Sequence, residues 1–188
     1  MSRRFRAEHA PAGAVRRLAA TKTPRGLAGP AEGRLRAGGL VLRCALGSGG
    51  VSRAKREGDG ASPAGSFRLL YGYYRADRLR RPRTALPLRA MGARDGWCDD
   101  PAHPAYNRPV RLPFAASCES MRREDGLYDL VLVLDYNLRP RRRGRGSAIF
   151  LHCAREDFSA TQGCVALRTH DLLRLLPRLS GGAVLTIA

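Results

Sequence analysis

The feature that most constrains the fold is a run of apolar residues between Gly126 and Asn137, which reads GLYDLVLVLDYN. Its centre is unbroken leucine and valine, a composition typical of a β-strand that is buried on both faces. A second apolar run, Ser147 to Cys153, follows after an arginine-rich loop. The sequence therefore predicts two neighbouring antiparallel strands at the centre of a β-rich core.

Further short strands are predicted around this pair. Gly38 and Gly39 favour a tight hairpin turn, because glycine adopts the positive φ angles that such turns need. The basic, proline-spaced segment 75–93 predicts a looping excursion over the core. The other predicted strands cover residues 15–23, 34–37, 40–45, 66–74 and 183–187.

Two helices are predicted. Thr169 to Leu176 has an N-cap candidate in Thr169, an apolar face and Pro177 just beyond its end. A shorter helix is predicted between Ser117 and Arg123. Short strands still dominate, so the chain is predicted to be mainly β, with one clear helix in its C-terminal part.

The length of 188 residues suits one domain with a sizeable core. Residues 1–13 are basic and predicted to be disordered, and residues 14–188 are predicted to form one domain. No apolar run approaches the roughly 20 residues that a membrane-spanning helix needs, so we expect no membrane span. The N-terminus also lacks the apolar segment of a secretory signal peptide.

The chain carries a formal net charge of +18. Such a charge favours binding to anionic polymers, either nucleic acid or an acidic cell-wall polymer. The densest cluster is Arg139–Arg145, which is predicted to be a loop between strands. Because the arginines are scattered through every segment, charge alone leaves both partners open.

Five cysteines are present, and no two of them form a CxxC pair. A structural zinc site is therefore not expected, and no metal is predicted. An odd number leaves at least one thiol unpaired. Whether Cys98 and Cys118 form a disulfide is left open at this stage.

The segment Ser147–Leu167, SAIFLHCAREDFSATQGCVAL, carries the pattern of a catalytic site. The strand ends with His152, a candidate base, and a polar loop then leads to Cys164, a candidate nucleophile. A thiol attacks carbonyl groups as the thiolate, so it needs a neighbouring base. Gly163 allows a tight turn that exposes main-chain N–H groups for a developing oxyanion. The alternative is that Cys164 is an inert buried thiol.

This segment resembles the catalytic domain of the L,D-transpeptidases, also called the YkuD domain. The family signature has a histidine upstream of a Ser/Thr-His-Gly-Cys segment. His152 and the run Thr161 to Val165 match it, in the form of a compact bacterial subgroup with a TxGCVAL-type motif. The segment Lys55–Phe67 is similar to a turn that recurs in the family. Two positions depart from the signature: Gln162 replaces the usual second histidine, and Ala166 replaces an arginine or asparagine.

The resemblance implies a β-sandwich of mixed sheets with one short helix after the nucleophile. It implies catalysis by Cys164, His152 and the main chain at Gly163. Substrate contacts are expected from Thr161 and Gln162, and from an aromatic and polar wall formed by Trp97, Tyr106 and Asn107. No metal or organic cofactor is implied.

The resemblance also implies a reaction: acyl transfer on peptidoglycan stem peptides through a thioester on Cys164, which gives L,D cross-links. Hydrolysis of the same thioester, as in an L,D-carboxypeptidase or endopeptidase, is the first alternative. A non-catalytic protein that binds peptidoglycan or nucleic acid through its basic surface is the second. The resemblance implies a location in the periplasm or cell envelope, whereas the missing signal peptide favours the cytoplasm. No obligate protein partner is predicted.

Overall fold

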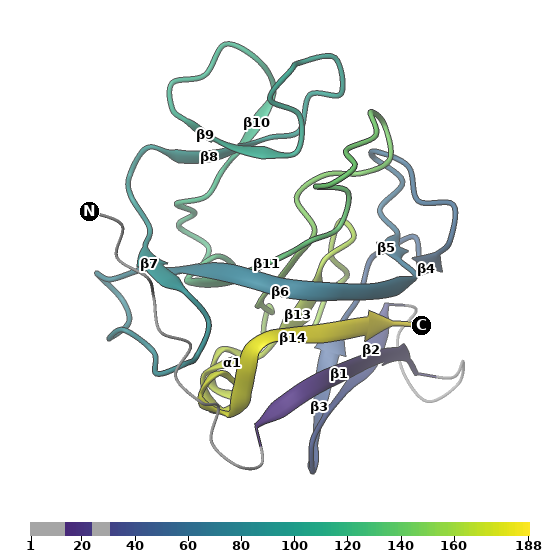
Figure 1. Cartoon of the computed structure of the whole chain (residues 1–188), viewed down its shortest axis with the longest axis vertical. Helices are drawn as coiled ribbons and strands as arrows, with labels where there is room; N and C mark the ends of the chain where they lie inside the picture. Colours follow the sequence, from purple (N-terminus) through teal and green to yellow (C-terminus); the bar gives the residue numbers. More distant parts are fainter. Residues whose placement is uncertain (1–13, 24–30) are drawn as a thin grey trace, which may run out of the picture.

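The computed structural model describes residues 14–23 and 31–188 (Figure 1). The basic segment 1–13, predicted to be disordered, lies outside the described residues. The strands are β1 Val15–Lys22, β2 Glu32–Ala37, β3 Leu40–Ala45, β4 Val51–Ser52, β5 Ser62–Pro63, β6 Gly65–Tyr74, β7 Leu88–Ala90, β8 Asp95–Cys98, β9 Arg108–Arg111, β10 Cys118–Ser120, β11 Leu130–Leu134, β12 Phe150–Cys153, β13 Val165–Leu167 and β14 Leu179–Ile187. The helices are α1 Thr169–Leu175 and the 3-10 turn Leu176–Arg178.

The main sheet has nine strands in the order β11-β12-β13-β3-β2-β1-β14-β6-β7. Strand β11 also pairs with β6, so the sheet closes on itself in a barrel-like arrangement. Pairs β1–β14, β12–β13 and β6–β7 are parallel and the others are antiparallel. The predicted mainly β fold with mixed sheets is confirmed, and closure of the main sheet is an additional feature.

Strand β11 is the buried strand that the sequence predicts. All five of its residues are buried, and it pairs antiparallel with β12 as expected. Its leucines, on one face, pack in the large core with residues of β1, β14 and α1. Val131 and Val133, on the other face, pack with Trp97 and Phe150 in a second core. Burial on both faces explains why no polar residue interrupts the strand.

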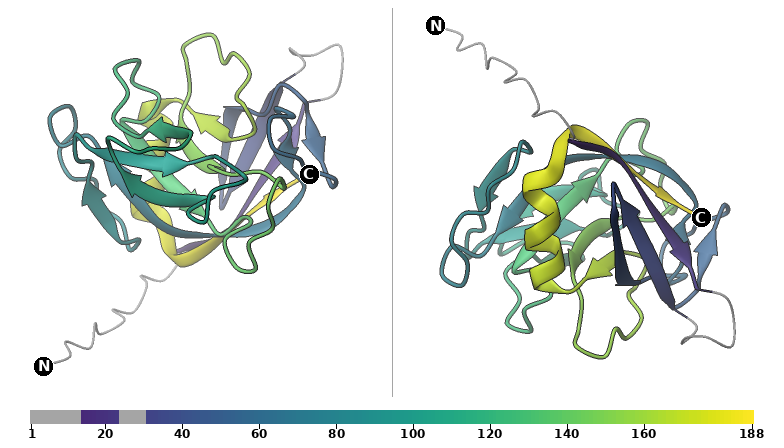
Figure 2. Two further views of the ribbon diagram at one scale, coloured as in Figure 1. Left: turned by 90° about the horizontal axis from the view of Figure 1, so that it is seen from above. Right: turned by 90° about the horizontal axis from the view of Figure 1, so that it is seen from below.

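Helix α1 lies on the side of the main sheet away from β8, β9 and β10 (Figure 2), and its leucines pack in the large core. Leu172 and Leu175 are buried, whereas the side chain of His170 is 62% exposed, as predicted for a surface histidine. The predicted N-cap is wrong: Arg168 occupies the cap and makes no side-chain capping bond. No helix in the described ranges, 14–23 and 31–188, is long and apolar enough to cross a membrane.

Strands β8, β9 and β10 form a separate three-stranded sheet above the main sheet (Figure 1). The helix predicted at Ser117–Arg123 is wrong, because Cys118–Ser120 pairs with β8 instead. The excursion 75–93 contains a short strand, β7, which extends the main sheet beside β6. In both places the edge of a neighbouring strand supplies main-chain hydrogen bonds, and these outweigh the local preference of the sequence for a helix or a loop.

Candidate active site

Strands β12 and β13 bring the two candidate catalytic residues to one face of the sheet. Leu151 pairs with Val165 and His152 with Ala166, in parallel register. Since side chains alternate between faces, Cys164 and His152 lie on the face opposite to the one that carries Leu151. Both line one cavity of about 270 Å³. The loop between them folds back far enough for both side chains to line this cavity.

His152 is held by its own strand. Its Nδ1 atom lies 2.8 Å from the main-chain oxygen of Cys153. A carbonyl oxygen only accepts hydrogen bonds, so Nδ1 carries the proton and Nε2 keeps a lone pair. The ring of Tyr128 packs edge-on at 5.3 Å between centroids. Burial lowers the pKa of His152 to about 4, against the opposing effect of the main-chain hydrogen bonds, so the ring is neutral at pH 7.

The Cys164 thiol is also neutral at rest. It donates to the Ala148 oxygen at 3.2 Å and accepts from the Phe150 N–H at 3.3 Å. Burial, and to a lesser extent the negative charge of Glu119, raise its pKa to about 12. Among the described residues the sulfur makes no hydrogen bond to His152. A thiolate therefore forms only when a proton acceptor takes the proton during attack.

Gly163 is required by the turn that precedes the nucleophile. Its φ is +125°, and a Cβ atom there would lie 2.7 Å from the Ala61 oxygen. Its N–H donates to Thr161 Oγ1 at 3.1 Å, and the Thr161 hydroxyl donates to the Cys164 oxygen at 2.7 Å. Thr161 therefore fixes the turn, and its hydroxyl occupies the Gly163 N–H that the sequence suggested for an oxyanion.

The glycine-rich segment 47–65 lies directly behind this turn. The Thr161 N–H donates to the Leu46 oxygen at 2.9 Å, and the Ser62 hydroxyl donates to the Cys164 oxygen at 3.4 Å. Lys55 is only 4% exposed and pairs with Asp59 at 2.5 Å. This part-buried pair anchors the loop that supports Gly163.

The structure places Trp97, Tyr106 and Asn107 behind the cavity. Each is 1% exposed, and none of them lines the cavity. Trp97 Nε1 donates to Asn107 Oδ1 at 2.9 Å, and the same oxygen accepts from the Ala148 N–H at 3.0 Å. These residues therefore position the loop that supplies the Ala148 carbonyl to the thiol. Of the predicted substrate contacts, Thr161 and the exposed Gln162 do line the cavity.

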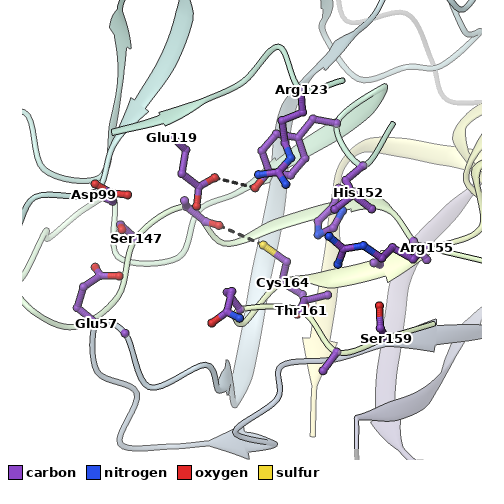
Figure 3. Close-up of a pocket in the computed structure, with 18 residues that line it drawn as sticks. Glu57, Asp99, Glu119, Arg123, Ser147, His152, Arg155, Ser159, Thr161 and Cys164 are labelled. Atoms are coloured by element: carbon purple, nitrogen blue, oxygen red, sulfur yellow. Dashed lines mark hydrogen bonds between the residues drawn. The ribbon is translucent and has the colours of Figure 1, made fainter. Parts of the chain in front are cut away.

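Sequence reasoning missed most of the charged lining of the cavity (Figure 3). Glu119 lies in the segment mispredicted as a helix, and its neighbours in space come from distant loops. The only sequence signal for Glu119 was the alternation of side chains between the two faces of β10, where Glu119 lies opposite Trp97. The missed charged residues are Glu57, Glu119, Arg123 and Arg155.

One family model matches the chain: YkuD, the L,D-transpeptidase catalytic domain, over residues 30–187. No curated protein and no solved structure matches the sequence. The matched range contains most of the chain, including His152, Cys164 and the cavity that they share. Domains of this family are enzymes of the L,D-transpeptidase type, and peptidoglycan is the substrate that the domain implies. The chain therefore belongs to the YkuD family of L,D-transpeptidase catalytic domains.

Proposed function

We propose that this protein is a cysteine acyltransferase that forms a thioester between Cys164 and a peptidoglycan stem peptide, with His152 as its base. The observation that supports the proposal is the shared cavity, which the Cys164 thiol and the His152 imidazole line from two adjacent strands, with Nδ1 of His152 bonded to the Cys153 oxygen. Because peptidoglycan lies outside the cytoplasmic membrane, we place this activity in the cell envelope.

In the first step, Nε2 of His152 takes the thiol proton of Cys164 as the sulfur attacks a peptide carbonyl carbon. The Cys164 thiol donates to the Ala148 carbonyl at rest, and this hydrogen bond must break when the proton passes to His152. The main-chain N–H of Cys164 is the donor proposed for the oxyanion, since the Gly163 N–H is engaged by Thr161. Such a donor contributes about 10²–10³ in rate in comparable sites.

In the second step, the C–N bond breaks and His152 returns the proton to the departing amine, which leaves a thioester. A second amine then attacks the thioester carbon and loses a proton to His152; the C–S bond breaks as the new amide bond forms, and His152 returns the proton to the Cys164 sulfur. Water in place of the amine makes the same site a hydrolase. The choice of acceptor thus separates a transpeptidase from a carboxypeptidase.

The test is intact-protein mass spectrometry after incubation with the stem tetrapeptide L-Ala-γ-D-Glu-diaminopimelate-D-Ala. We expect a mass increase equal to the tripeptide acyl group, mapped to Cys164. Cys164→Ala should abolish the adduct, and His152→Gln should slow its formation by about 10²–10⁴-fold, the usual contribution of a general base.

The matched control is Cys118→Ser, which removes a half-buried thiol outside the cavity and should retain the adduct. Release of a cross-linked dimer identifies a transferase, and release of free tripeptide identifies a hydrolase. An adduct that persists in Cys164→Ala, or that is absent from the unmodified protein under every condition, refutes the proposal.

A further inference from the structure

The outer face of strands β1, β2 and β3 carries a group of exposed arginines. Along β2 the side chains alternate, with Arg34 and Arg36 exposed and Leu35 buried in the large core. Cross-strand register places Arg34 opposite Arg43 of β3. Arg17 of β1 is exposed too, and it lines one hollow together with Arg36. Together these four arginines form the basic face.

The basic face has little counter-charge. Arg17, Arg34 and Arg36 form no ion pair with any residue in the ranges 14–23 and 31–188. Arg43 pairs with Glu32 at 2.8 Å. Like charges directly opposite each other on neighbouring strands are destabilising, as Arg34 and Arg43 are here. A bound polyanion would remove this repulsion.

Two hollows lie between these arginines. The first, of about 580 Å³, has Arg17 and Arg36 in its lining. The second, of about 210 Å³, has Arg34 and Arg43 in its lining. Val41 lines both, so the hollows adjoin. Each hollow therefore offers two guanidinium groups, whose planar N–H forks match the oxygens of a phosphate group.

The spacing of the arginines favours a ligand with repeated charges. Arg34 and Arg36 are two residues apart on β2, which puts their Cα atoms about 7 Å apart along the strand. They line different hollows. A single small anion fills one hollow, whereas a chain with an anionic group on each unit reaches both.

Hydroxyl groups are interleaved with the arginines on this face. Thr186 pairs with Ala19 in the register of β14 and β1, and it lines the first hollow. Its hydroxyl lies 2.8 Å from that of Ser66 on β6. Thr21 is exposed and lies opposite Arg34. Hydroxyls both donate and accept hydrogen bonds, so the face offers contacts to polyol units as well as to phosphates.

The face lacks the groups that favour nucleic acids and membranes. Val41, which is 51% exposed, is the one large apolar side chain that is exposed in the part of the chain that the structure describes. Among the same residues, no aromatic side chain lines either hollow. Single-stranded nucleic acid stacks its bases on aromatic rings, and a membrane surface takes up an extended apolar face. The basic face therefore fits a polyanion without bases or acyl chains.

We infer that the basic face docks an anionic cell-wall polymer in which phosphodiesters join polyol units. The arginines bind the phosphates, the hydroxyls of β1 and β14 contact the polyol groups, and Val41 packs against the carbon chain. Peptidoglycan is the substrate that the domain implies, so the polymer is one that this protein meets beside its substrate. The inference goes beyond the proposed acyl transfer, because docking needs no thioester.

The basic face and the catalytic cavity lie on the same side of the sheet. Ala45 of β3 pairs with Ala166 of β13, which lines the cavity. Arg43 is two residues from Ala45 and shares its face. Its guanidinium lies 4.2 Å from the centroid of the Phe158 ring, which packs with both alanines. A polymer on the basic face therefore lies on the side that carries Cys164 and leaves the cavity open to a peptide.

The direct test is equilibrium binding of soluble, lipid-free poly(glycerol phosphate) to the Cys164→Ala protein, in which no thioester forms. Arg34→Gln combined with Arg36→Gln should weaken binding at least 10-fold, because charge-assisted hydrogen bonds to phosphate are lost in both hollows. The matched control is Arg142→Gln combined with Arg143→Gln, which removes the same charge from the loop 139–145 and should cost less than twofold. An equal loss in the two double variants, or no binding before substitution, overturns the inference.

Two competing ligands test the identity of the polymer. Single-stranded and duplex oligodeoxynucleotides with the same number of phosphates should bind at least 10-fold more weakly than poly(glycerol phosphate). Vesicles of phosphatidylglycerol and phosphatidylcholine should not bind. If an oligonucleotide or the vesicles bind as tightly as the polymer, and the binding depends on Arg34 and Arg36, the wall-polymer inference is overturned.

A folding control and an activity control complete the test. Arg34→Gln with Arg36→Gln should unfold at the same temperature as the unmodified protein or higher, since the substitution removes facing like charges. With Cys164 present, the same variant should form the adduct with the soluble tetrapeptide at an unchanged rate. Loss of the adduct in this variant contradicts a docking role separate from the cavity. Absence of the adduct from the unmodified protein refutes the acyl transfer and leaves the docking site intact.

Discussion

The Nδ1 atom of His152 lies 2.8 Å from the main-chain oxygen of Cys153, the residue that follows it on β12. The Tyr128 ring packs edge-on against the imidazole, with 5.3 Å between the ring centroids. The contact selects one tautomer of the imidazole. It therefore presents the basic nitrogen Nε2 without any need for an acidic side chain as orienting partner.

The pH dependence of acylation tests the state of His152. Burial, with a smaller contribution from the charge of Arg123, lowers its pKa to about 4, against the opposing effects of the main-chain hydrogen bonds and Asp125. Only the neutral ring accepts a proton, so activity should be present above this pKa and lost as the pH falls through it. We expect kcat/KM for acylation to fall with an apparent pKa near 4, rather than near the ordinary value of about 6.5. An acid limb near 6.5 contradicts this prediction.

Gly163→Ala should disrupt the turn before the nucleophile. A Cβ atom at this position meets the Ala61 oxygen at 2.7 Å, and the φ of +125° is unfavourable for any other residue. Strained backbone of this kind costs about 1–3 kcal/mol, to be measured by urea unfolding, and acylation should slow with it. Gly39→Ala is the control, because nothing lies within 4 Å of the added atom. Equal stability of the two variants contradicts the role of Gly163.

Asn107→Ala should destabilise the protein although Asn107 lies outside the cavity. The substitution leaves the Trp97 Nε1–H and the Ala148 N–H without an acceptor in a buried region. We expect the free energy of unfolding to fall by about 3 kcal/mol, since each buried unpaired donor costs roughly 1–3 kcal/mol. Acylation should slow as well, because Ala148 supplies the carbonyl that holds the thiol. Trp97→Phe, which removes one donor and keeps an aromatic ring, should lose only about 1 kcal/mol.

Cys98 and Cys118 should form a disulfide when oxidised. They lie opposite each other on β8 and β10. Hydrogen bonds run from Met121 N–H to Asp95 O and from Asp99 N–H to Ser117 O. Because hydrogen-bonded and non-hydrogen-bonded pairs alternate along an antiparallel ladder, Cys98 and Cys118 form a non-hydrogen-bonded pair. In such pairs the Cα atoms are about 4.5 Å apart, which a disulfide spans.

Thiol exchange with oxidised glutathione should therefore close this bond, with a loss of two hydrogens in the protein mass. Closing a loop of about 20 residues stabilises by roughly 3 kcal/mol, so Tm should rise by about 6–12 °C. Acylation of Cys164 should be retained. Successive side chains of β10 point to opposite faces, so Glu119, which lines the cavity, points away from the face that carries Cys118. A disulfide between other cysteines, or a Tm rise in Cys118→Ser under the same treatment, contradicts the prediction.

Local patterns were sufficient to predict many of the elements of this chain. The apolar run 126–137 predicts β11, paired glycines predict the β2–β3 hairpin, and Pro177 marks the end of α1. The candidate nucleophile and base were also identified from a local pattern, a strand that ends in His152 and a glycine turn before Cys164. In each case the determining residues are near neighbours along the chain.

What the sequence by itself determined is the mainly β character, the helix that follows Cys164 and the chemical identity of the candidate nucleophile and base. The tertiary structure alone decided that the main sheet closes, that Ser117–Arg123 forms a strand edge, and that Trp97 supports the cavity from behind. It also decided that carboxylates from residues 57, 99 and 119 meet beside Cys164. The physical reason is that strand pairing and burial join segments far apart in the chain, and no local periodicity records which surfaces will meet.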